Sequence, residues 1–206
     1  MPRLLLATNN AGKVAEFRQL LDGCGWQIVT PSEIGLKIDV DETGQTYAEN
    51  ATLKAVAYAN ASGLTSLADD SGLEVDALDG RPGVLSARYA GADRTDAERA
   101  EALLTELRDV ADERRTARFR CVIAIASRSA TANGDEEVEL AEGTVEGRIA
   151  RAPRGESGFG YDPIFLLPER GLTMAELPAG EKHNVSHRGA AAREARKVLE
   201  KLLHES

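Results

Sequence analysis

The stretch Leu67-Ala-Asp-Asp-Ser-Gly-Leu-Glu-Val75 places two adjacent carboxylates, Asp69 and Asp70, directly after a short apolar run. Because neighbouring side chains of a strand point to opposite faces, one carboxylate could turn toward a site while the other braces the chain. A carboxylate in that position suits a hard cation or general-base catalysis. Asp, Ser and Gly are also ordinary turn residues, so an acidic turn between two strands explains the stretch equally well at this point.

The composition is that of a globular protein with a mainly aliphatic core. The chain has 206 residues, of which 42% are hydrophobic and 29% charged, and this length is ample for one domain or one domain with two lobes. The net charge of −9 argues against a general nucleic-acid binder, because affinity for phosphate backbones comes from clustered Lys and Arg. An acidic protein can still bind a small phosphate-bearing ligand through a few cations, a metal and backbone amides.

The cysteines and the N-terminus predict a cytoplasmic protein. Cys24 and Cys121 are too few for a disulfide framework and lack CxxC spacing, which is typical of a reducing cytosol. The start Met-Pro-Arg-Leu-Leu-Leu-Ala lacks the long apolar core of a signal peptide, and no apolar run approaches the length of a membrane span. We therefore expect no membrane partner.

The beginning of the chain predicts a strand, a polar loop and a helix. Residues 3–7 form a short apolar run, Thr8-Asn-Asn-Ala-Gly-Lys13 interrupts it, and apolar residues at helical spacing follow as far as Gly23. Amides at the helix start together with Lys13 would make an anion site. The loop is not a Walker A motif, which requires G-x-x-x-x-G-K-[ST], so a plain strand-to-helix turn is the alternative.

A second helix is predicted from Thr46 to about Ala61, because Thr46 and Glu49 have the spacing of a capping box. Asn50 and Lys54 stand four residues apart on it and therefore share one face. Taken alone, that face is a solvated helix surface. An acidic patch at 39–44 precedes the helix, however, and brings carboxylates near Lys54 in the sequence.

The remaining pattern predicts a sheet with further helices. Strands are expected at 26–30, 34–40, 65–68, 73–75, 114–128 and 137–149, a turn at 80–83, and helices at 95–110 and 190–204. Alternation fails after Cys121, which predicts a central strand buried on both faces. The turn Asn133-Gly134-Asp135 would join this strand to the next in a long antiparallel hairpin.

Two segments near the C-terminus carry candidate ligand contacts. Residues 155–163 place three glycines around Phe159 and Tyr161, a pattern that exposes a ring and lets backbone approach a flat ligand. A loop with incidental aromatics is the alternative. Lys182, His187 and Arg188 then gather just before the last helix, which fits an anionic or carbonyl-bearing ligand better than a structural role.

Five motifs together carry a family resemblance. They occur in this order: Thr8-Asn-Asn-Ala-Gly-Lys13, Ala68-Asp-Asp-Ser-Gly-Leu73, Pro82-Gly-Val-Leu-Ser-Ala-Arg-Tyr89, Gly158-Phe-Gly-Tyr-Asp-Pro163 and Ser186-His-Arg-Gly189. The chain strongly resembles the non-canonical purine nucleoside triphosphate pyrophosphatases, also called inosine/xanthosine triphosphate diphosphatases. The match runs from residue 3 to the last helix. Each motif is weak by itself, whereas five in order at the family's spacing are highly specific.

The resemblance implies a fold and a reaction. The fold would be α/β, with one long twisted mixed β-sheet flanked by helices and two lobes around a central nucleotide-binding cleft. Residues 1–206 would form this single two-lobed domain, which would associate as a homodimer. The reaction would be Mg²⁺-dependent hydrolysis of dITP, ITP or XTP between the α- and β-phosphates. It would release a nucleoside monophosphate and pyrophosphate, and would cleanse the nucleotide pool of deaminated purines.

The resemblance also implies the roles of individual residues. Asp70 would be the catalytic base and a metal ligand, Asp69 would brace it, and either Asp41 or Glu42 would be the second metal ligand. Phe159 would stack on the purine, and the loop that follows it would read the 6-keto edge together with the later cations. Substrate binding is assigned to Thr8, Asn9, Asn10, Ala11, Gly12, Lys13, Lys54, Ser71, Phe159, Gly160, Tyr161, Asp162, Lys182, His187 and Arg188.

Two rival functions remain open at this stage. One is a Mg²⁺-dependent nucleotide pyrophosphatase of another base specificity. The other is a nucleotide-binding module without turnover. The adjacent carboxylates Asp69 and Asp70, together with Lys13, favour an enzyme over a module.

Overall fold

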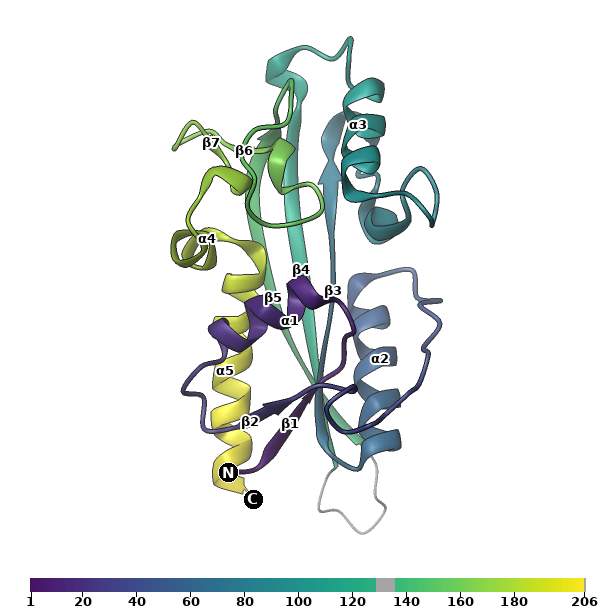
Figure 1. Ribbon diagram of the computed structural model, residues 1–206, viewed down its shortest axis with the longest axis vertical. Coiled ribbons are helices and arrows are strands. Elements are labelled where there is room, and N and C mark those ends of the chain that lie inside the picture. Colours follow the sequence, from purple (N-terminus) through teal and green to yellow (C-terminus); the bar gives the residue numbers. More distant parts are fainter. Residues whose placement is uncertain (129–135, 206) are drawn as a thin grey trace. The chain divides into compact units, whose positions relative to one another are not determined.

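The computed structural model describes residues 1–128 and 136–205, and within them the strands form one mixed sheet in the order β2-β1-β3-β4-β5-β6-β7 (Figure 1). The strands are β1 (Arg3–Leu6), β2 (Gln27–Val29), β3 (Thr65–Val75), β4 (Thr116–Arg128), β5 (Glu136–Ile149), β6 (Phe165–Leu167) and β7 (Leu172–Thr173). Strand β1 pairs in parallel with β2 and β3, whereas β6 pairs antiparallel with β5 and β7.

Five α-helices accompany the sheet in the described residues. They are α1 (Ala11–Leu20), α2 (Tyr47–Ser62), α3 (Asp96–Glu106), α4 (Ala179–Val185) and α5 (His187–Glu205). Short 3₁₀ turns include η1 (Asp76–Leu78), η2 (Gly83–Arg88), η3 (Asp112–Arg114), η4 (Asp162–Ile164) and η5 (Met174–Glu176). These elements confirm the expected α/β class with a mixed sheet flanked by helices. Of the described helices, none is both long and apolar enough to cross a membrane.

The chain divides into two compact units. Unit 1 comprises Met1–Asp70, Cys121–Gly143 and Ala190–Ser206, and unit 2 comprises Ser71–Arg120 and Thr144–Gly189. The first boundary falls inside β3, between the second carboxylate and the serine that follows it.

In unit 1, alternation along the strands sorts the side chains between two faces of the sheet. One face packs against α1 and α5 through Leu4, Leu6, Phe17, Leu67, Cys121, Ile123, Ala195 and Leu199. The opposite face packs against α2 through Leu5 and mainly through small side chains, namely Ala7, Ala51, Ala55, Ala68 and Ala124. The period of two therefore predicts that Asp69 continues the α1 side and Asp70 the α2 side.

Unit 2 has its own apolar core. It joins the end of β3, the buried stripe of α3 and the aromatic residues of β4 and β6. Its members include Leu73, Leu103, Leu107, Phe119, Ile149, Tyr161 and Phe165. The ring centroids of Phe119 and Phe165 lie 4.3 Å apart, slightly closer than is usual for aromatic pairs.

Strand β3 runs without a break through the carboxylates, from Thr65 to Val75. The interpretation of residues 69–72 as an acidic turn between two strands was therefore wrong, as was the division into strands at 65–68 and 73–75. Neighbouring strands β1 and β4 lie on either side of β3 in the sheet, and pairing within a sheet overrides the turn preference of Asp, Ser and Gly.

The prediction of a strand at 34–40 was also wrong. The chain turns there, with Ile34 N–H donating to the Thr30 carbonyl and Gly35 at a φ of 68°. The alternation that suggested a strand is nevertheless real, because Ile34, Leu36, Ile38 and Val40 all pack against the α2 side of the core. The segment follows an alternating pattern of burial without joining the sheet.

Helix α3 ends at Glu106, earlier than the expected Val110. Beyond Glu106 the chain continues in a turn, and two arginines bind the carbonyls of that turn. Arg115, only 2% exposed, donates to the carbonyl of Leu107 at 2.6 Å and to those of Ile149 and Ala150 at 2.8 Å each. Arg151 donates to the carbonyls of Arg108 and Val110 at 3.0 Å each.

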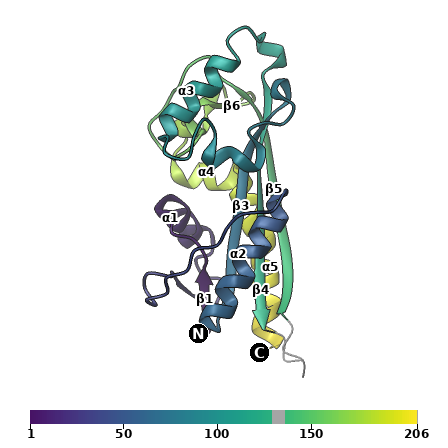
Figure 2. The same cartoon turned by 90° about the vertical axis from the view of Figure 1, so that its right-hand side faces the viewer.

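Other sequence predictions have mixed outcomes. The central strand is confirmed, since residues 121–126 of β4 are all buried. Strands β4 and β5 are neighbours and run side by side in both views (Figures 1 and 2), although the turn expected at 133–135 lies outside the described residues. The last helix begins at His187 instead of Ala190, and α4 was not anticipated.

The capping box of α2 is present in full and generates a prediction. Thr46 Oγ1 accepts from Glu49 N–H, and the Glu49 carboxylate accepts from Thr46 N–H. Thr46→Ala is expected to lower the free energy of unfolding by about 1 kcal/mol in urea denaturation, because the Glu49 N–H in the first turn loses its side-chain acceptor. Thr46→Ser is the control and should retain most of the stability. Equal stability of the Ala variant and the wild type would contradict this role of the cap.

Candidate functional site

The two adjacent carboxylates lie on opposite sides of β3, as the alternation predicts. Asp69 is 2% exposed and its Oδ1 lies 3.0 Å from the Lys13 ammonium of α1. On the same side the Cys121 thiol donates to Asp69 Oδ2 over 3.9 Å. A buried carboxylate needs a partner of opposite charge. Asp69 therefore braces Lys13 and, through it, the start of α1.

Lys13 lies in the first turn of α1, just after the polar loop that follows β1. Asn10 is the N-cap of α1, where its side-chain oxygen accepts from Lys13 N–H at 3.0 Å, and Thr8 Oγ1 accepts from Asn10 N–H at 3.2 Å. The first turn of α1 contains no acidic residue. Asn9, Asn10 and Ala11 are exposed at this helix start. The loop therefore combines exposed backbone at a helix N-terminus with a nearby cation, the arrangement that favours anions.

Asp70 faces α2 and contacts two of its residues. Asn50 Nδ2 donates to Asp70 Oδ2 at 3.1 Å, and the Lys54 ammonium lies 3.9 Å from Asp70 Oδ1. Burial raises the pKa of Asp70 above its ordinary value, although Lys54 and Asn50 counteract the shift. An aspartate with a raised pKa is a better proton acceptor than a solvated one.

Lys54 lies among several oxygen atoms. Its ammonium donates to Glu42 Oε1 at 2.6 Å and to the Asp69 carbonyl at 2.7 Å. Burial lowers the pKa of Lys54, but Asp69, Asp70 and Glu42 outweigh it and raise the pKa above its ordinary value. The ammonium is therefore charged at neutral pH. We call Lys13, Glu42, Asn50, Lys54, Asp69 and Asp70 the carboxylate cluster; all of them belong to unit 1.

The carboxylate cluster bears on two points that the sequence left open. The face of α2 that carries Asn50 and Lys54 is not a solvated surface, because Asn50 is fully buried and its Oδ1 also accepts from Gly44 N–H at 2.8 Å. Asn50 was missing from the predicted site, although its spacing from Lys54 was the available signal. Of the two acidic candidates, Glu42 contacts Lys54, whereas Asp41 is exposed.

In unit 2 the loop around Phe159 is held by one carboxylate. Asp162 Oδ2 accepts from Phe159 N–H at 2.9 Å and from the Lys182 ammonium at 2.7 Å. Gly158 has a φ of 82°, and a Cβ there would lie 2.1 Å from the same Asp162 oxygen. Only glycine permits both this backbone conformation and this approach.

Two buried cations lie near the Phe159 ring. Lys182 Nζ and the guanidinium carbon of Arg188 are each 5.3 Å from the ring centroid, a distance suited to cation–π attraction. Lys182 is 5% exposed and Arg188 is 3% exposed. Arg188 Nη2 also donates to Ser71 Oγ at 3.0 Å. We call Phe159, Asp162, Lys182 and Arg188 the aromatic-loop cluster.

His187 and Tyr161 are more deeply built into unit 2 than their motifs suggested. The His187 ring stacks on Phe119, with centroids 4.7 Å apart and planes at 18°. Tyr161 is 5% exposed, and its hydroxyl donates to the Ser86 carbonyl at 2.9 Å. A contact between Tyr161 and a ligand would therefore come from its backbone, next to Gly160, which donates to Asp96 Oδ2 at 2.7 Å.

Ser86 is a further residue that the sequence reasoning did not single out. Its hydroxyl donates to the Gly83 carbonyl at 2.6 Å and accepts from Leu73 N–H at 2.8 Å. With the bond from Tyr161 to its carbonyl, this one residue joins β3, η2 and the Phe159 loop. The motif at 82–89 was the available signal, but nothing in the sequence shows which strand its serine contacts.

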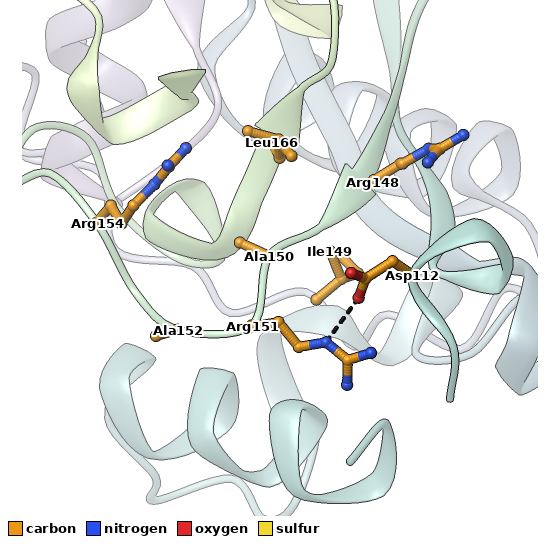
Figure 3. Close-up of a pocket in the computed structure, with 8 residues that line it drawn as sticks. All are labelled: Asp112, Arg148, Ile149, Ala150, Arg151, Ala152, Arg154 and Leu166. Carbon is orange, nitrogen blue, oxygen red and sulfur yellow. Dashed lines mark hydrogen bonds and ion pairs between the residues drawn. The ribbon is translucent and has the colours of Figure 1, made fainter. Parts of the chain in front are cut away.

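A cavity of about 450 Å³ elsewhere in unit 2 is lined by Asp112, Arg148, Ile149, Ala150, Arg151, Ala152, Arg154 and Leu166 (Figure 3). Its arginines suggest an anion site, but two of them serve the fold. Arg151 pairs with Asp112 at 2.6 Å and caps the end of α3, and Arg154 donates to the Gly171 carbonyl at 3.0 Å. The cavity is therefore explained by packing around these backbone carbonyls.

The fold and the two clusters define an α/β protein with one set of residues suited to anions and another suited to a flat ring. The model of the Ham1 family matches residues 4–198, and the chain belongs to this family. The resemblance of the five motifs is thereby confirmed.

Named relatives match almost the whole chain. The dITP/XTP pyrophosphatase of Bacillus subtilis is 47% identical over 200 residues, covering 97% of this chain and 98% of the relative. That of Desulforamulus reducens is 50% identical over 200 residues, covering 97% and 96%. A solved HAM1 protein from Coxiella burnetii superimposes with a TM-score of 0.85 at 43% identity, covering 100% of both chains.

The glycines of the Phe159 loop generate a second prediction. Gly158→Ala and Gly160→Ala both place a Cβ at positive φ, which costs about 1–2 kcal/mol. Only Gly158→Ala also meets the Asp162 carboxylate, whereas nothing lies within 4 Å of a Cβ at Gly160. Urea denaturation should therefore show a loss of stability for Gly158→Ala larger by at least about 1 kcal/mol. Equal losses of stability in the two variants would show that the contact between the added Cβ and Asp162 does not destabilise the protein.

Proposed function

We propose that the chain hydrolyses non-canonical purine nucleoside triphosphates, namely dITP, ITP or XTP, to the nucleoside monophosphate and pyrophosphate. The observation that carries the proposal is Asp70, a buried carboxylate with a raised pKa that Asn50 orients and Lys54 accompanies. Membership of the Ham1 family and the relatives named dITP/XTP pyrophosphatase support it. The activity would make this protein a hydrolase that cleanses the nucleotide pool of deaminated purines.

The carboxylate cluster suits the triphosphate. A triphosphate brings about four negative charges, which cations must offset before water can attack. Lys13 at the start of α1 and Lys54 on α2 would supply two positive charges. The backbone of Thr8, Asn9, Asn10, Ala11 and Gly12 would bind phosphate oxygens at the helix N-terminus. Both lysines already face carboxylates, so they are oriented before substrate arrives.

The same cluster fits Mg²⁺. Glu42 and Asp70 would hold the ion, since both carboxylates lie against the Lys54 ammonium and both are hard oxygen donors. Within residues 1–128 and 136–205 no group of three or more His, Cys, Asp or Glu side chains is arranged to hold a metal. Mg²⁺ is usually bound by one or two carboxylates with substrate phosphates and water, so this pair suffices. When bound, the ion would offset phosphate charge and lower the pKa of water.

Asp70 would act as the general base. Its Oδ1 would accept a proton from the attacking water, while Asn50 holds Oδ2 in place. The water oxygen would form the new bond to phosphorus as the bridging bond between the α- and β-phosphates breaks. Pyrophosphate and the nucleoside monophosphate would then leave. Asp69 would take no proton in this scheme and would keep Lys13 in position.

The aromatic-loop cluster suits the base. Phe159 would stack on the purine, with the backbone of Gly160 and Tyr161 beside it and Asp162 fixing the loop. Lys182 and Arg188 are donors, so they would pair with a 6-keto oxygen and would face the donor of a 6-amino group unfavourably. His187 would support Arg188 at the start of α5 through its stacking on Phe119.

We also propose that residues 1–206 work as one two-lobed domain and as a homodimer, as the resemblance implies, and that the protein works in the cytoplasm, as the cysteines and the N-terminus predict. The second candidate function is a pyrophosphatase of another base specificity, because both lysines and both aspartates would serve any triphosphate. A module without turnover is less well supported, since it would not need a buried carboxylate with a raised pKa.

Removal of the base is the third prediction. Asp70→Asn keeps the size of the side chain but cannot accept a proton, so pyrophosphate release from dITP should fall at least about 100-fold. Calorimetry should show nucleotide binding that remains within about tenfold of the wild type. Asp22→Asn, at an exposed aspartate of unit 1, is the control and should keep full activity. Comparable hydrolysis by Asp70→Asn would remove Asp70 from the role of base.

A panel of triphosphates tests the substrate class and is the fourth prediction. With Mg²⁺ present, kcat/KM for dITP, ITP and XTP should exceed that for dATP by at least about 100-fold, because a 6-amino group leaves the donors of the site unpaired. The panel also includes dGTP, whose 6-keto oxygen can accept from the same donors. Addition of a chelator should abolish turnover. Turnover of dATP or dGTP matching that of dITP would favour the other base specificity. Binding of ITP without hydrolysis would favour the module.

A further inference from the structure

Arg188 connects the aromatic loop to the strand that carries the carboxylates. Its Nη2 donates to Ser71 Oγ at 3.0 Å, and its guanidinium lies 5.3 Å from the centroid of the Phe159 ring. Ser71 is the residue directly after Asp70 in β3. One buried side chain therefore contacts both the ring proposed to stack on the base and the neighbour of the proposed general base.

The chemistry of arginine allows both contacts at once. A guanidinium is a rigid planar fork with five N–H donors and no acceptor, so it can bind Ser71 and a second acceptor in one orientation. A lysine ammonium at the same position would be a flexible point charge without this geometry. Arg188 can therefore donate to the base while it keeps its hydrogen bond to Ser71, provided that the base offers an acceptor.

The segment of β3 at Ser71 is held on both sides of that residue. Asn50 holds the Asp70 carboxylate at 3.1 Å, and Ser86 accepts from Leu73 N–H at 2.8 Å. The side chain of Ser71 between them is tied by Arg188. Loss of that bond would loosen Ser71 in the middle of this short segment. Ser71 is joined to Asp70 by a peptide bond.

We propose that Arg188 is a positioning residue that makes hydrolysis depend on the identity of the base, with Ser71 as the link to Asp70; this rests on the proposed function. A 6-keto purine accepts from the guanidinium and leaves the Ser71 bond intact. A 6-amino purine sets donor against donor, displaces the guanidinium and breaks that bond. Discrimination between bases is then expressed in kcat as well as in KM.

The fifth prediction tests this link with two triphosphates that differ in the 6-substituent, ITP and ATP. Ser71→Ala should lower kcat for ITP about tenfold, the usual effect of losing one hydrogen bond to a charged group, and change its KM less than about twofold. The kcat for ATP should fall much less, because that substrate already lacks the bond. The ratio of kcat for ITP to kcat for ATP should therefore fall several-fold.

Two further variants keep the test decisive. Ser71→Cys has nearly the size of serine but a weak acceptor, so it should reproduce the change in ratio if the alanine variant does not fold. Ser62→Ala removes a hydroxyl that donates to the Tyr58 carbonyl at 2.7 Å in α2, and both kcat values should remain those of the wild type.

The outcomes separate the coupling from the proposed function. Equal loss of kcat for ITP and ATP in Ser71→Ala, or a change confined to KM, would overturn the coupling while the wild type still shows the proposed activity. Absence of turnover of either triphosphate by the wild type would overturn the proposed function and the coupling with it. A selective loss of kcat for ITP supports both.

Discussion

The arrangement of this protein depends on the burial of two adjacent carboxylates in an internal strand. Transfer of a carboxylate from water into protein costs several kcal/mol unless a partner of opposite charge and hydrogen bonds compensate for it. Because Asp69 and Asp70 point to opposite sides of β3, each side of the sheet must supply its own cation. Helix α1 supplies Lys13 on one side, and α2 supplies Lys54 on the other.

This requirement couples local structure to the proposed chemistry. In the proposed reaction, the lysines that face the carboxylates would also offset the charge of the triphosphate, so they would be in place before the nucleotide arrives. In unit 2, too, buried charged groups have partners that hold them in place. Lys182 pairs with Asp162, which in turn fixes the backbone of Phe159, and Arg188 is tied to Ser71. In both units a buried charge is held by a partner that also orients a functional group, and preorganisation of this kind lowers the cost of catalysis.

Local signals in the sequence predicted much of the fold. The capping box at Thr46 marked the start of α2, and the unbroken apolar run after Cys121 marked the central strand. Predictions failed where partners distant in sequence decide the outcome. The alternation at 34–40 correctly gave the burial but not the pairing with the sheet, and Arg115 and Arg151 bind the carbonyls of the turn that follows α3. Such partners leave no trace in a short window of sequence.

For the site, the sequence by itself determined the residue types, their order along the chain and the opposite orientation of the two carboxylates. Those features were enough for the family, because five motifs at fixed spacing rarely coincide by chance. Only the tertiary structure decided that Asn50 holds Asp70, that Glu42 contacts Lys54 and that Arg188 binds Ser71, which is 117 positions away in the chain. The physical reason is that strand and helix periods are local properties of the backbone. The partner of a buried polar group, in contrast, is fixed by which elements pack together.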